Sequence, residues 1–386
     1  MSPQLNPTLT NMRTYPFVAL EAKKRAVAER GVEMIDFGAG DPREPTPVFV
    51  RDALVRALEA TSSYPKAAGL PELRAAIARW IDRRTGARVD PEREIVPTSG
   101  SKEAIFSFAN VAVGRDARKD VVVVTEPGYP VPPAAARLAG ARVVALPLRA
   151  ANGFLPDLDE LDARTWDDVA LLWLNYPNNP TAATAPRAFL DDAARLAARH
   201  DFWLASDEAY GEIYVDEDDP PASALEAEDR DVVVVFNTLS KRSSMTGYRS
   251  GFVAAPAPVV NALRLYRPLA GTASPEFVQR AAIGAWGDEE HVRATRAVYR
   301  AKRAVFEDFL PSRGVRVAGG RATFYLWLEV PRGETSESFA GRLLDHGVVV
   351  APGSFFGPAG EGYVRMALVP TLEACERARA VLEEVL

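Results

Sequence analysis

Six short runs of consecutive apolar residues constrain the fold of this chain more than any other feature of its sequence. They are VVVV (121–124), RVVAL (142–146), VALLWL (169–174), FWLAS (202–206), VVVVF (232–236) and GFVAA (251–255). Continuous rather than alternating runs are typical of strands buried on both faces of a mainly parallel sheet. Helical patterns lie between them, such as 102–113 and 188–200. Strands that alternate with helices predict an α/β core.

The sequence after about residue 275 has a different pattern and predicts a second, α+β domain. A long helical stretch covers about 275–310, and the later segments are a strand pattern at 323–330, a helix near 335–346, apolar segments at 347–353 and 363–368, and a last helix from Glu373. The first forty residues look irregular and are expected to pack on this domain. We therefore predict a large domain of residues 45–270 and a small domain of residues 1–44 and 271–386.

Length, charge and hydropathy limit the classes of partner. With 386 residues, 47% of them hydrophobic, the chain can bury the cores of two domains. The net charge of −6 and the lack of a long basic run argue against nucleic acid as a partner. No stretch of 18 apolar residues exists, which argues against a membrane span.

Other residue counts bear on location and on metals. The single cysteine, Cys375, cannot form an internal disulfide, and we interpret it as a packed helix residue. The N-terminus lacks an apolar segment of signal-peptide length, so a cytoplasmic protein is expected. The three histidines have no metal-site spacing, and no metal is predicted.

Polar residues follow four of the apolar runs directly. They are EPGYP (126–130), NYPNNPT (175–181), DEAY (207–210) and NTLSK (237–241). In open α/β sheets, ligands bind beyond the carboxyl ends of the strands. Four separate strands would thus bring Asp, Asn, Tyr and Lys side chains to one edge, where we predict a pocket.

Two further segments suggest that the ligand carries a phosphate. In PTSGSKEAIF (97–106), Gly100 and Ser101 open a helix whose free N–H groups would attract an anion. In NTLSKRSSMTGYRSGF (237–252), Lys241 lies among small hydroxyl residues, and Arg249 follows eight positions later. A lysine that bonds covalently to a phosphorylated cofactor would have such neighbours.

Seven segments, in this order and spacing, give the chain a specific resemblance that extends over nearly its whole length. They are residues 64–77, 98–105, 126–140, 175–181, 206–210, 239–252 and 363–368. The chain is similar to the class I and II aminotransferases, fold-type I enzymes that use pyridoxal 5′-phosphate. The resemblance implies a mainly parallel seven-stranded sheet between helices, a smaller α+β domain, a homodimer, and an amino acid and a 2-oxo acid as substrates.

The resemblance also implies catalytic roles for individual residues. Lys241 resembles the lysine that holds the cofactor covalently and later moves a proton between the substrate and the cofactor. Asp207 resembles the carboxylate that keeps the pyridine nitrogen protonated. Asn179 and Tyr210 resemble the pair that hydrogen-bonds the phenolic oxygen of the cofactor, and Tyr129 the aromatic residue that stacks on its ring.

Phosphate binding is implied for a second group of residues, from three parts of the chain. Arg249 resembles the phosphate-binding arginine, and Tyr64 a tyrosine that reaches a phosphate across the dimer interface. The other members of this group supply N–H or hydroxyl donors: Gly100, Ser101, Lys102, Thr238 and Ser240. Two positions depart from the family pattern, since Thr238 replaces a common serine and Ala182 replaces a common glycine and is expected to alter its turn.

The substrate side of the site is implied by residues near both ends of the chain. Arg365 resembles the arginine that clamps the substrate α-carboxylate, with Gly40 and Asn179 beside it. The segments 346–368 and 239–253 and the opening of the chain resemble succinyldiaminopimelate aminotransferases of lysine synthesis. That substrate, N-succinyl-LL-diaminopimelate with 2-oxoglutarate as acceptor, has a distal carboxylate that needs a cation, and the candidates are Arg43, which we favour, Lys66, Arg242 and Arg267.

Alternatives with the same core motifs stay open at the level of sequence. Related aminotransferases act on aspartate, alanine, aromatic amino acids or LL-diaminopimelate, and a carbon–sulfur lyase would use the same cofactor residues. A non-catalytic regulatory protein that senses the cofactor is a more distant alternative. Such proteins usually carry a DNA-binding segment, whereas this chain is not basic.

Overall fold

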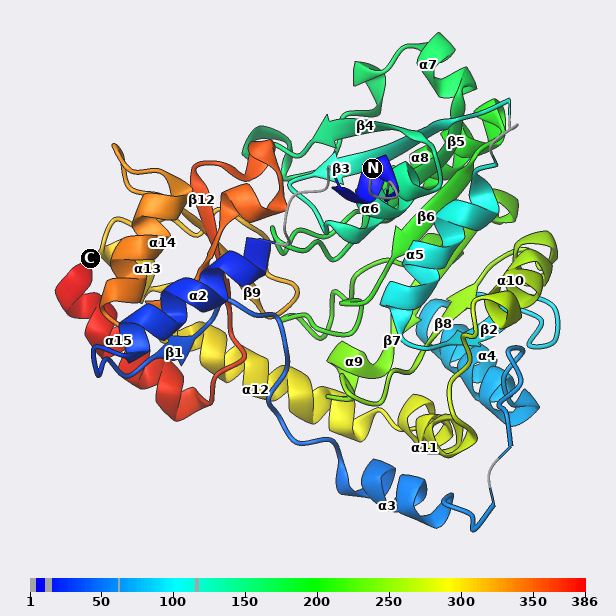
Figure 1. Cartoon of the computed structure of the whole chain (residues 1–386), viewed down its shortest axis with the longest axis horizontal. Coiled ribbons are helices and arrows are strands. Elements are labelled where there is room, and N and C mark those ends of the chain that lie inside the picture. The colour runs from blue at the N-terminus through cyan, green and yellow to red at the C-terminus, as the bar shows by residue number, and fades with distance from the viewer. Residues whose placement is uncertain (1–4, 11–15, 62, 115–117) are drawn as a thin grey trace.

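The structure, a computed structural model, describes residues 5–10, 16–61, 63–114 and 118–386. The parts of the predicted small domain at 1–4 and 11–15, which include part of the opening segment that carries the resemblance, lie outside the described residues. A large α/β domain lies beside a smaller α+β domain, and the long helix α12 (Glu290–Glu307) runs from one to the other (Figure 1).

The large domain is built on a seven-stranded sheet with strand order β2-β8-β7-β6-β5-β3-β4. Its strands are β2 (Ile95–Thr98), β3 (Val121–Glu126), β4 (Arg142–Pro147), β5 (Val169–Asn175), β6 (Trp203–Asp207), β7 (Val233–Thr238) and β8 (Gly251–Ala254). Strands β3 to β7 run parallel, and β8 is antiparallel to both of its neighbours. Six of the seven strands are the six apolar runs. The seventh, β2, is an edge strand that contains Pro97, which edge positions tolerate.

Helices cover both faces of this sheet, as the continuous apolar runs predict. The helices of the large domain are α3 (Val48–Arg56), α4 (Pro71–Thr85), α5 (Ser101–Ala112), α6 (Val131–Leu138), α7 (Ala163–Asp167), α8 (Arg187–His200), α9 (Leu239–Arg242), α10 (Ala257–Leu269) and α11 (Glu276–Gly287). The adjacent residues Leu171 and Leu172 of β5 belong to separate apolar clusters. Successive side chains of a strand point to opposite faces. The cluster of Leu172 includes α4, α8 and α11, and that of Leu171 includes α5, α6 and α10.

The small domain combines a three-stranded antiparallel sheet, order β11-β12-β9, with a two-stranded parallel pair. Its strands are β1 (Ile35–Asp36), β9 (Tyr325–Glu329), β10 (Val348–Val349), β11 (Ala351–Pro352) and β12 (Tyr363–Ala367). Its other helices are α13 (Phe309–Ser312), α14 (Ser336–Asp345) and α15 (Leu372–Val385). The helical stretch predicted over 275–310 is divided at residues 288–289, between α11 and α12.

The described residues of the N-terminal segment include two helices, so the segment is not irregular throughout. Only part of it packs on the small domain, because the first of these helices contacts α6 of the large domain. Helix α2 (Pro16–Ala28) lies along the small domain, after the short α1 (Pro7–Thr10) (Figure 1). Leu20 and Val27 of α2 form an apolar cluster with Leu344 and Val349. Because the apolar residues of α2 have only a weak helical periodicity, the sequence pattern did not reveal it.

Several short 3₁₀ segments connect the helices and strands. They are η1 (Ala150–Asn152), η2 (Leu158–Glu160), η3 (Ala224–Glu226), η4 (Arg230–Val232), η5 (Gly353–Phe356) and η6 (Pro358–Gly360). Cys375 is buried in α15, and burial raises the pKa of its thiol to about 11, as suits a packed helix residue. Within the described part of the chain, no helix has both the length and the apolar character needed to cross a membrane.

Candidate active site

A cavity of about 450 Å³ lies at the carboxyl ends of the central parallel strands, where the sequence predicts it. Asn175, Asp207 and Thr238, the last residues of β5, β6 and β7, all line it. Twelve of the predicted site residues contribute to its wall: Gly40, Ser101, Lys102, Tyr129, Asn179, Asp207, Tyr210, Thr238, Ser240, Lys241, Arg249 and Arg365. The structure thus brings together residues from positions 40 to 365 of the chain.

Lys241 projects into this cavity from the short helix α9. The side chain of Thr238 caps the helix by accepting a hydrogen bond from the Ser240 N–H, and the Lys241 amine donates to the Gly40 carbonyl oxygen at 2.6 Å. Burial lowers the pKa of Lys241 to about 8, and the charge of Arg365 acts in the same direction while that of Asp41 opposes it. A substantial fraction of the amine is therefore neutral near pH 7–8, the form that acts as nucleophile and proton acceptor.

Asp207 is buried at the end of β6, on the floor of the cavity. Its carboxylate accepts a hydrogen bond from the Ala209 N–H at 3.1 Å, and the Asn175 side chain donates to its carbonyl oxygen at 2.8 Å. Burial raises the pKa of Asp207 to about 7, an effect that the Ala209 N–H and the charge of Lys241 oppose. A cation placed against this carboxylate would restore its charged form, because an adjacent opposite charge lowers a carboxyl pKa.

The N-terminus of α5 and the segment after α9 form a set of donors that suits an anion. Gly100 takes a φ of 77°, and a Cβ atom at that position would lie 2.4 Å from a guanidinium nitrogen of Arg249. Ser101 and Lys102 begin the twelve-residue α5, whose first N–H groups have no partner within the helix. Thr238 and Ser240 add hydroxyl groups to the same wall. A phosphate monoester matches this combination of N–H groups, hydroxyls and a guanidinium.

The small domain supplies the opposite wall through Arg365, on β12. This buried guanidinium donates to the Asn179 side-chain oxygen at 2.8 Å and to the Gly38 carbonyl at 2.7 Å. Its carbon centre lies 4.3 Å from the ring centroid of Tyr325 and 4.7 Å from that of Phe356. These contacts hold the guanidinium in one orientation beside the cavity.

Two buried tyrosines connect the domains next to Arg365. The hydroxyl oxygens of Tyr210 and Tyr325 are 2.7 Å apart. Burial raises the pKa of Tyr210 well above its ordinary value, with a further contribution from Tyr325, and burial also raises the pKa of Tyr325. Both phenols therefore stay protonated at neutral pH and serve as hydrogen-bond donors.

The turn that presents Asn179 is closed by hydrogen bonds around Ala182. Ala182 takes a φ of 59°, the left-handed region that glycine adopts readily. Hydrogen bonds of 2.9 Å from the Ala182 N–H to the Asn178 carbonyl and of 2.8 Å from the Asn178 N–H to the Ala183 carbonyl close the turn. Alanine thus occupies the left-handed conformation itself, and the expectation that it alters this turn stays a prediction.

Other predicted site residues lie outside the cavity wall. Gly100 does not line the cavity, but its lack of a side chain leaves room for the guanidinium of Arg249. Arg43 and Lys66 are exposed and do not line the cavity either. The side chain of Tyr64 is 100% exposed in the single chain, so its cross-interface role stays a prediction.

Two of the cations proposed for a distal carboxylate are wrong, because the fold uses them elsewhere. Arg242 is buried against the Ala285 carbonyl and Glu289. Arg267 is buried against Glu103 and the carbonyl oxygens of Ala67 and Pro97.

Several cavity residues were not predicted from the sequence. Tyr325 and Phe356 lie in apolar segments that suggest core packing, so only tertiary contacts place them at the site. Asp41 could have been found from its place next to Gly40, whereas Glu21 lies in the unexpected helix α2. No group of His, Cys, Asp or Glu side chains placed to bind a metal occurs among the residues that the structure describes.

This protein is a fold-type I enzyme that uses pyridoxal 5′-phosphate. The features that agree with this class are the seven-stranded sheet, the cavity lysine, the buried aspartate and the set of donors that suits an anion. The chain belongs to the family "Aminotransferase class I and II", whose model matches residues 32–382. Among its relatives, an LL-diaminopimelate aminotransferase of Nitratidesulfovibrio vulgaris is 39% identical over 381 residues, which are 97% of each chain.

Solved structures agree with this assignment. BacF from Bacillus subtilis, in a substrate-bound structure, has a TM-score of 0.92 at 31% identity and covers 99% of this chain and 98% of its own. A Thermus thermophilus protein described as a "probable N-succinyldiaminopimelate aminotransferase" has a TM-score of 0.89 at 32% identity, with 96% of this chain and 100% of that chain covered.

Replacing Asp207 by asparagine should stabilise the cofactor-free protein in a pH-dependent manner. The folded-state pKa of about 7 lies above the ordinary value of 3.8, so the contribution of Asp207 to stability is largest below about pH 4 and is lost as the pH rises from there through 7. Asparagine does not titrate, and the advantage of Asp207→Asn should grow to roughly 2–4 kcal/mol by pH 8. Urea unfolding between pH 4.5 and 8 measures it, with the exposed Asp159→Asn as control. An advantage of Asp207→Asn that does not change with pH would contradict the buried, protonatable carboxyl.

Proposed function

We propose that this aminotransferase exchanges an amino group between LL-diaminopimelate and a 2-oxo acid. The carrying observation is a cavity that has Lys241 and Asp207 on the side of the large domain and the fixed guanidinium of Arg365 on the other. The 39% identical relative is an LL-diaminopimelate aminotransferase, which supports this choice of substrate.

The cofactor residues have distinct tasks in this proposal. Pyridoxal 5′-phosphate supplies an aromatic ring that accepts the electron pair left on the substrate α-carbon when its proton departs. Lys241 would hold the cofactor through its amine and, once that amine is free, would move the proton at the substrate α-carbon. The buried Asp207 stabilises a proton on the pyridine nitrogen, since each charge removes the desolvation cost of the other.

The remaining cofactor residues orient the ring and the phosphate. The amide of Asn179 and the hydroxyl of Tyr210 are donors for the phenolic oxygen, and Tyr129 lines the cavity where it can cover the ring. Ser101, Lys102, Thr238, Ser240 and Arg249 bind the phosphate. A fixed phosphate and a fixed ring nitrogen leave the cofactor one orientation, with its reactive carbon toward Lys241.

Arg365 binds the α-carboxylate of the substrate. A planar guanidinium makes two parallel hydrogen bonds to a carboxylate, and here the stacking of Tyr325 and Phe356 and the bond to Asn179 fix its plane beforehand. The Asn179 contact also couples this arginine to the cofactor-binding turn.

The distal part of the cavity favours a substrate with a second ammonium group. Asp41 and Glu21 line the cavity, and Glu21 is paired with Lys24 at 2.5 Å. Among the residues that the structure describes, no other side chain forms a hydrogen bond or an ion pair with Asp41. The distal end of LL-diaminopimelate carries an ammonium, which an aspartate attracts, together with a carboxylate. In the N-succinyl compound this ammonium is a neutral amide that bears a further carboxylate, which Asp41 would repel.

The N-succinyl compound nevertheless stays the second candidate substrate. The segments 239–253 and 346–368 resemble enzymes for that substrate, and the Thermus thermophilus neighbour at 32% identity carries that description. Arg43, which does not line the cavity of its own chain, is the cation that we assign in that case to the succinyl carboxylate, the distal group that LL-diaminopimelate lacks.

We also propose a homodimer. Val48, Val55 and Leu58, on or just after α3, expose 60%, 64% and 56% of their surfaces, and Tyr64 follows at full exposure. Large exposed apolar side chains close together often mark an interface. An interface here would cover them and bring Tyr64 to the phosphate site of the partner.

Borohydride reduction of the cofactor-loaded protein should place the pyridoxyl group on Lys241, as peptide mass mapping would show. Lys241→Ala should lower the turnover number by several orders of magnitude, because the covalent link and the proton carrier disappear together. Lys102→Ala, at a lysine in the same cavity, is the matched control and should keep measurable turnover. Label on a different lysine would refute the assignment.

Wild-type enzyme should turn over LL-diaminopimelate with a higher kcat/KM than N-succinyl-LL-diaminopimelate, as measured with 2-oxoglutarate as acceptor. Asp41→Asn should lower kcat/KM for LL-diaminopimelate about threefold to tenfold, the range for a charged contact that is partly solvated, and leave glutamate unchanged. Arg365→Ala should harm every amino-acid substrate.

Arg43→Ala separates the two substrate candidates. Loss confined to the N-succinyl compound, together with wild-type preference for it, would replace the LL-diaminopimelate proposal by the second candidate. Release of pyruvate and sulfide from cysteine instead of amino transfer would indicate a carbon–sulfur lyase.

The dimer proposal predicts that hybrid proteins have a defined activity. Sedimentation should give about twice the chain mass of 41.9 kDa. If Tyr64 binds the phosphate of the partner subunit, a hybrid of one Lys241→Ala chain and one Tyr64→Phe chain places both defects in one site and leaves the other site intact. Purified hybrid should then show about half of the wild-type turnover, whereas a Tyr64 that serves its own chain would leave no intact site.

A further inference from the structure

The helix that carries Lys241 is too short to hold its own position. Helix α9 has four residues, and a helix of this length is unstable without external contacts. Thr238 holds its first turn through hydrogen bonds to Ser240 and to the Ser250 carbonyl. The position of Lys241 therefore depends on what holds the other end of the helix, at Arg242 and Ser243.

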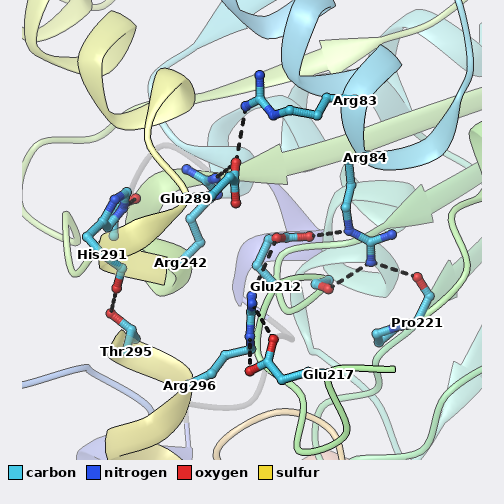
Figure 2. Close-up of polar contacts among 12 residues, drawn as sticks. Arg83, Arg84, Glu212, Glu217, Pro221, Arg242, Glu289, His291, Thr295 and Arg296 are labelled. Carbon is cyan, nitrogen blue, oxygen red and sulfur yellow. Dashed lines mark hydrogen bonds and ion pairs between the residues drawn. The ribbon is translucent and has the colours of Figure 1, made fainter. Parts of the chain in front are cut away.

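Arg242 is anchored to the junction between α11 and α12 (Figure 2). Its guanidinium, 1% exposed, packs against the adjacent rings of Trp80 and Trp286, with its carbon centre 5.5 Å and 5.0 Å from their centroids. It donates to the Ala285 carbonyl at 2.6 Å and to the Glu289 carboxylate at 2.6 Å. A buried guanidinium with these partners cannot move without leaving an unpaired charge in the core.

Ser243 is held by the same junction through a histidine. The Ser243 hydroxyl oxygen lies 2.8 Å from Nε2 of His291, and Nδ1 of His291 lies 2.6 Å from the Asp288 carboxylate. This is the order of groups that activates serine in hydrolases, but Ser243 is 1% exposed and does not line the cavity. The arrangement therefore fixes a position and does not supply a nucleophile.

The protonation of His291 suits this role. Burial lowers its pKa; the charge of Arg242 acts in the same direction, while Asp288 and Glu289 oppose it. The ring is therefore neutral at neutral pH. It donates a hydrogen bond from Nδ1 to Asp288 and accepts one at Nε2 from the Ser243 hydroxyl. The ring of Phe49 packs against it edge to face, at 5.6 Å between centroids.

We propose that Arg242, Ser243, Asp288, Glu289 and His291, here named the α9 clamp, are positioning residues that hold the Lys241 amine where it can reach both reacting carbons. Two adjacent carboxylates, Asp288 and Glu289, each hold one of the two residues that follow Lys241, the first through His291 and the second directly. The inference rests on the proposed role of Lys241. The position of its amine matters because displacement of a reacting group by about 1 Å can lower a rate about a hundredfold.

The clamp is itself tied to the rest of the large domain and to the substrate side. Arg83 donates to Glu289 at 3.2 Å, and Arg296, further along α12, pairs with Glu217 at 2.6 Å (Figure 2). Near its other end, α12 donates from Arg303 to the Tyr325 carbonyl at 2.9 Å. The same helix thus contacts the back of α9 and the strand that carries Tyr325 beside Arg365.

The kinetic test uses Ser243→Ala, His291→Ala and the double variant. Each single variant should lower kcat about tenfold with KM within twofold of wild type, because proton transfer suffers and substrate binding does not. The double variant should be no slower than the slower single variant, since both break one chain of contacts. Thr295→Val is the matched control. It removes a 2.9 Å hydrogen bond to the His291 carbonyl on the same helix, without touching α9, and should leave kcat within twofold.

A second readout does not depend on turnover. In cofactor-free protein, labelling of Lys241 by trinitrobenzenesulfonate as a function of pH, followed by peptide mass mapping, reports the pKa of its amine. Ser243→Ala and His291→Ala should move the midpoint upward from about 8, by half a unit or more, as α9 loosens and Lys241 gains solvent. Thr295→Val should not move it.

The outcomes separate this inference from the proposed function. If Ser243→Ala and His291→Ala leave both kcat and the labelling midpoint unchanged, or if Thr295→Val changes them equally, the α9 clamp is refuted. If borohydride marks another lysine but the labelling midpoint of Lys241 still moves, the clamp holds Lys241 and the proposed catalytic role is refuted.

Discussion

The parallel pairing of β5, β6 and β7 is the constraint on which the rest of the site depends. Asn175 is in register with Asp207, and Asp207 with Phe236, so β5 and β6 end at one level of the sheet and β7 continues two residues further, to Thr238. Buried parallel strands cannot expose their backbone, and polar side chains can appear only where the strands end. Asp207 and the helix that carries Lys241 therefore follow from the neighbouring strands β6 and β7.

The same burial that creates the cavity makes its charged groups costly in the absence of the cofactor. Desolvation moves the pKa of Asp207 up and that of Lys241 down, so that both lie near neutrality. A cationic ring nitrogen beside Asp207 and a phosphate between α5 and Arg249 would offset these costs. The stability that the cavity lacks by itself is thus available as binding energy for pyridoxal 5′-phosphate, as is common at functional sites.

The small domain completes the cavity through contacts that span the chain. Arg365 joins the Gly38 carbonyl, near the N-terminus, to Asn179 of the large domain, and Tyr325 joins Tyr210. Helix α12 connects these contacts to the back of α9. A displacement between the two domains would therefore move the carboxylate-binding group relative to the lysine, which makes the interface between domains part of the site.

The sequence by itself determined the sheet and most of the site. Six apolar runs predicted six strands, and the residues after them, Asn179, Asp207, Tyr210 and Lys241, line the cavity as predicted. These predictions succeeded because strand burial and the position after a strand are local properties of the chain. Their roles toward the cofactor remain those that the family resemblance implies.

Only the tertiary structure decided which of the remaining polar residues face the cavity. Arg242 and Arg267 resemble available cations in sequence, but the fold buries both against carboxylates and carbonyl oxygens. Tyr325 looks like core and Asp41 like a loop residue, yet both line the cavity. The direction of such side chains depends on neighbours that lie hundreds of residues away, and no local pattern records those neighbours. The sequence therefore determined the strands and their polar ends, while long-range packing decided which cations line the cavity and which are buried against other parts of the chain.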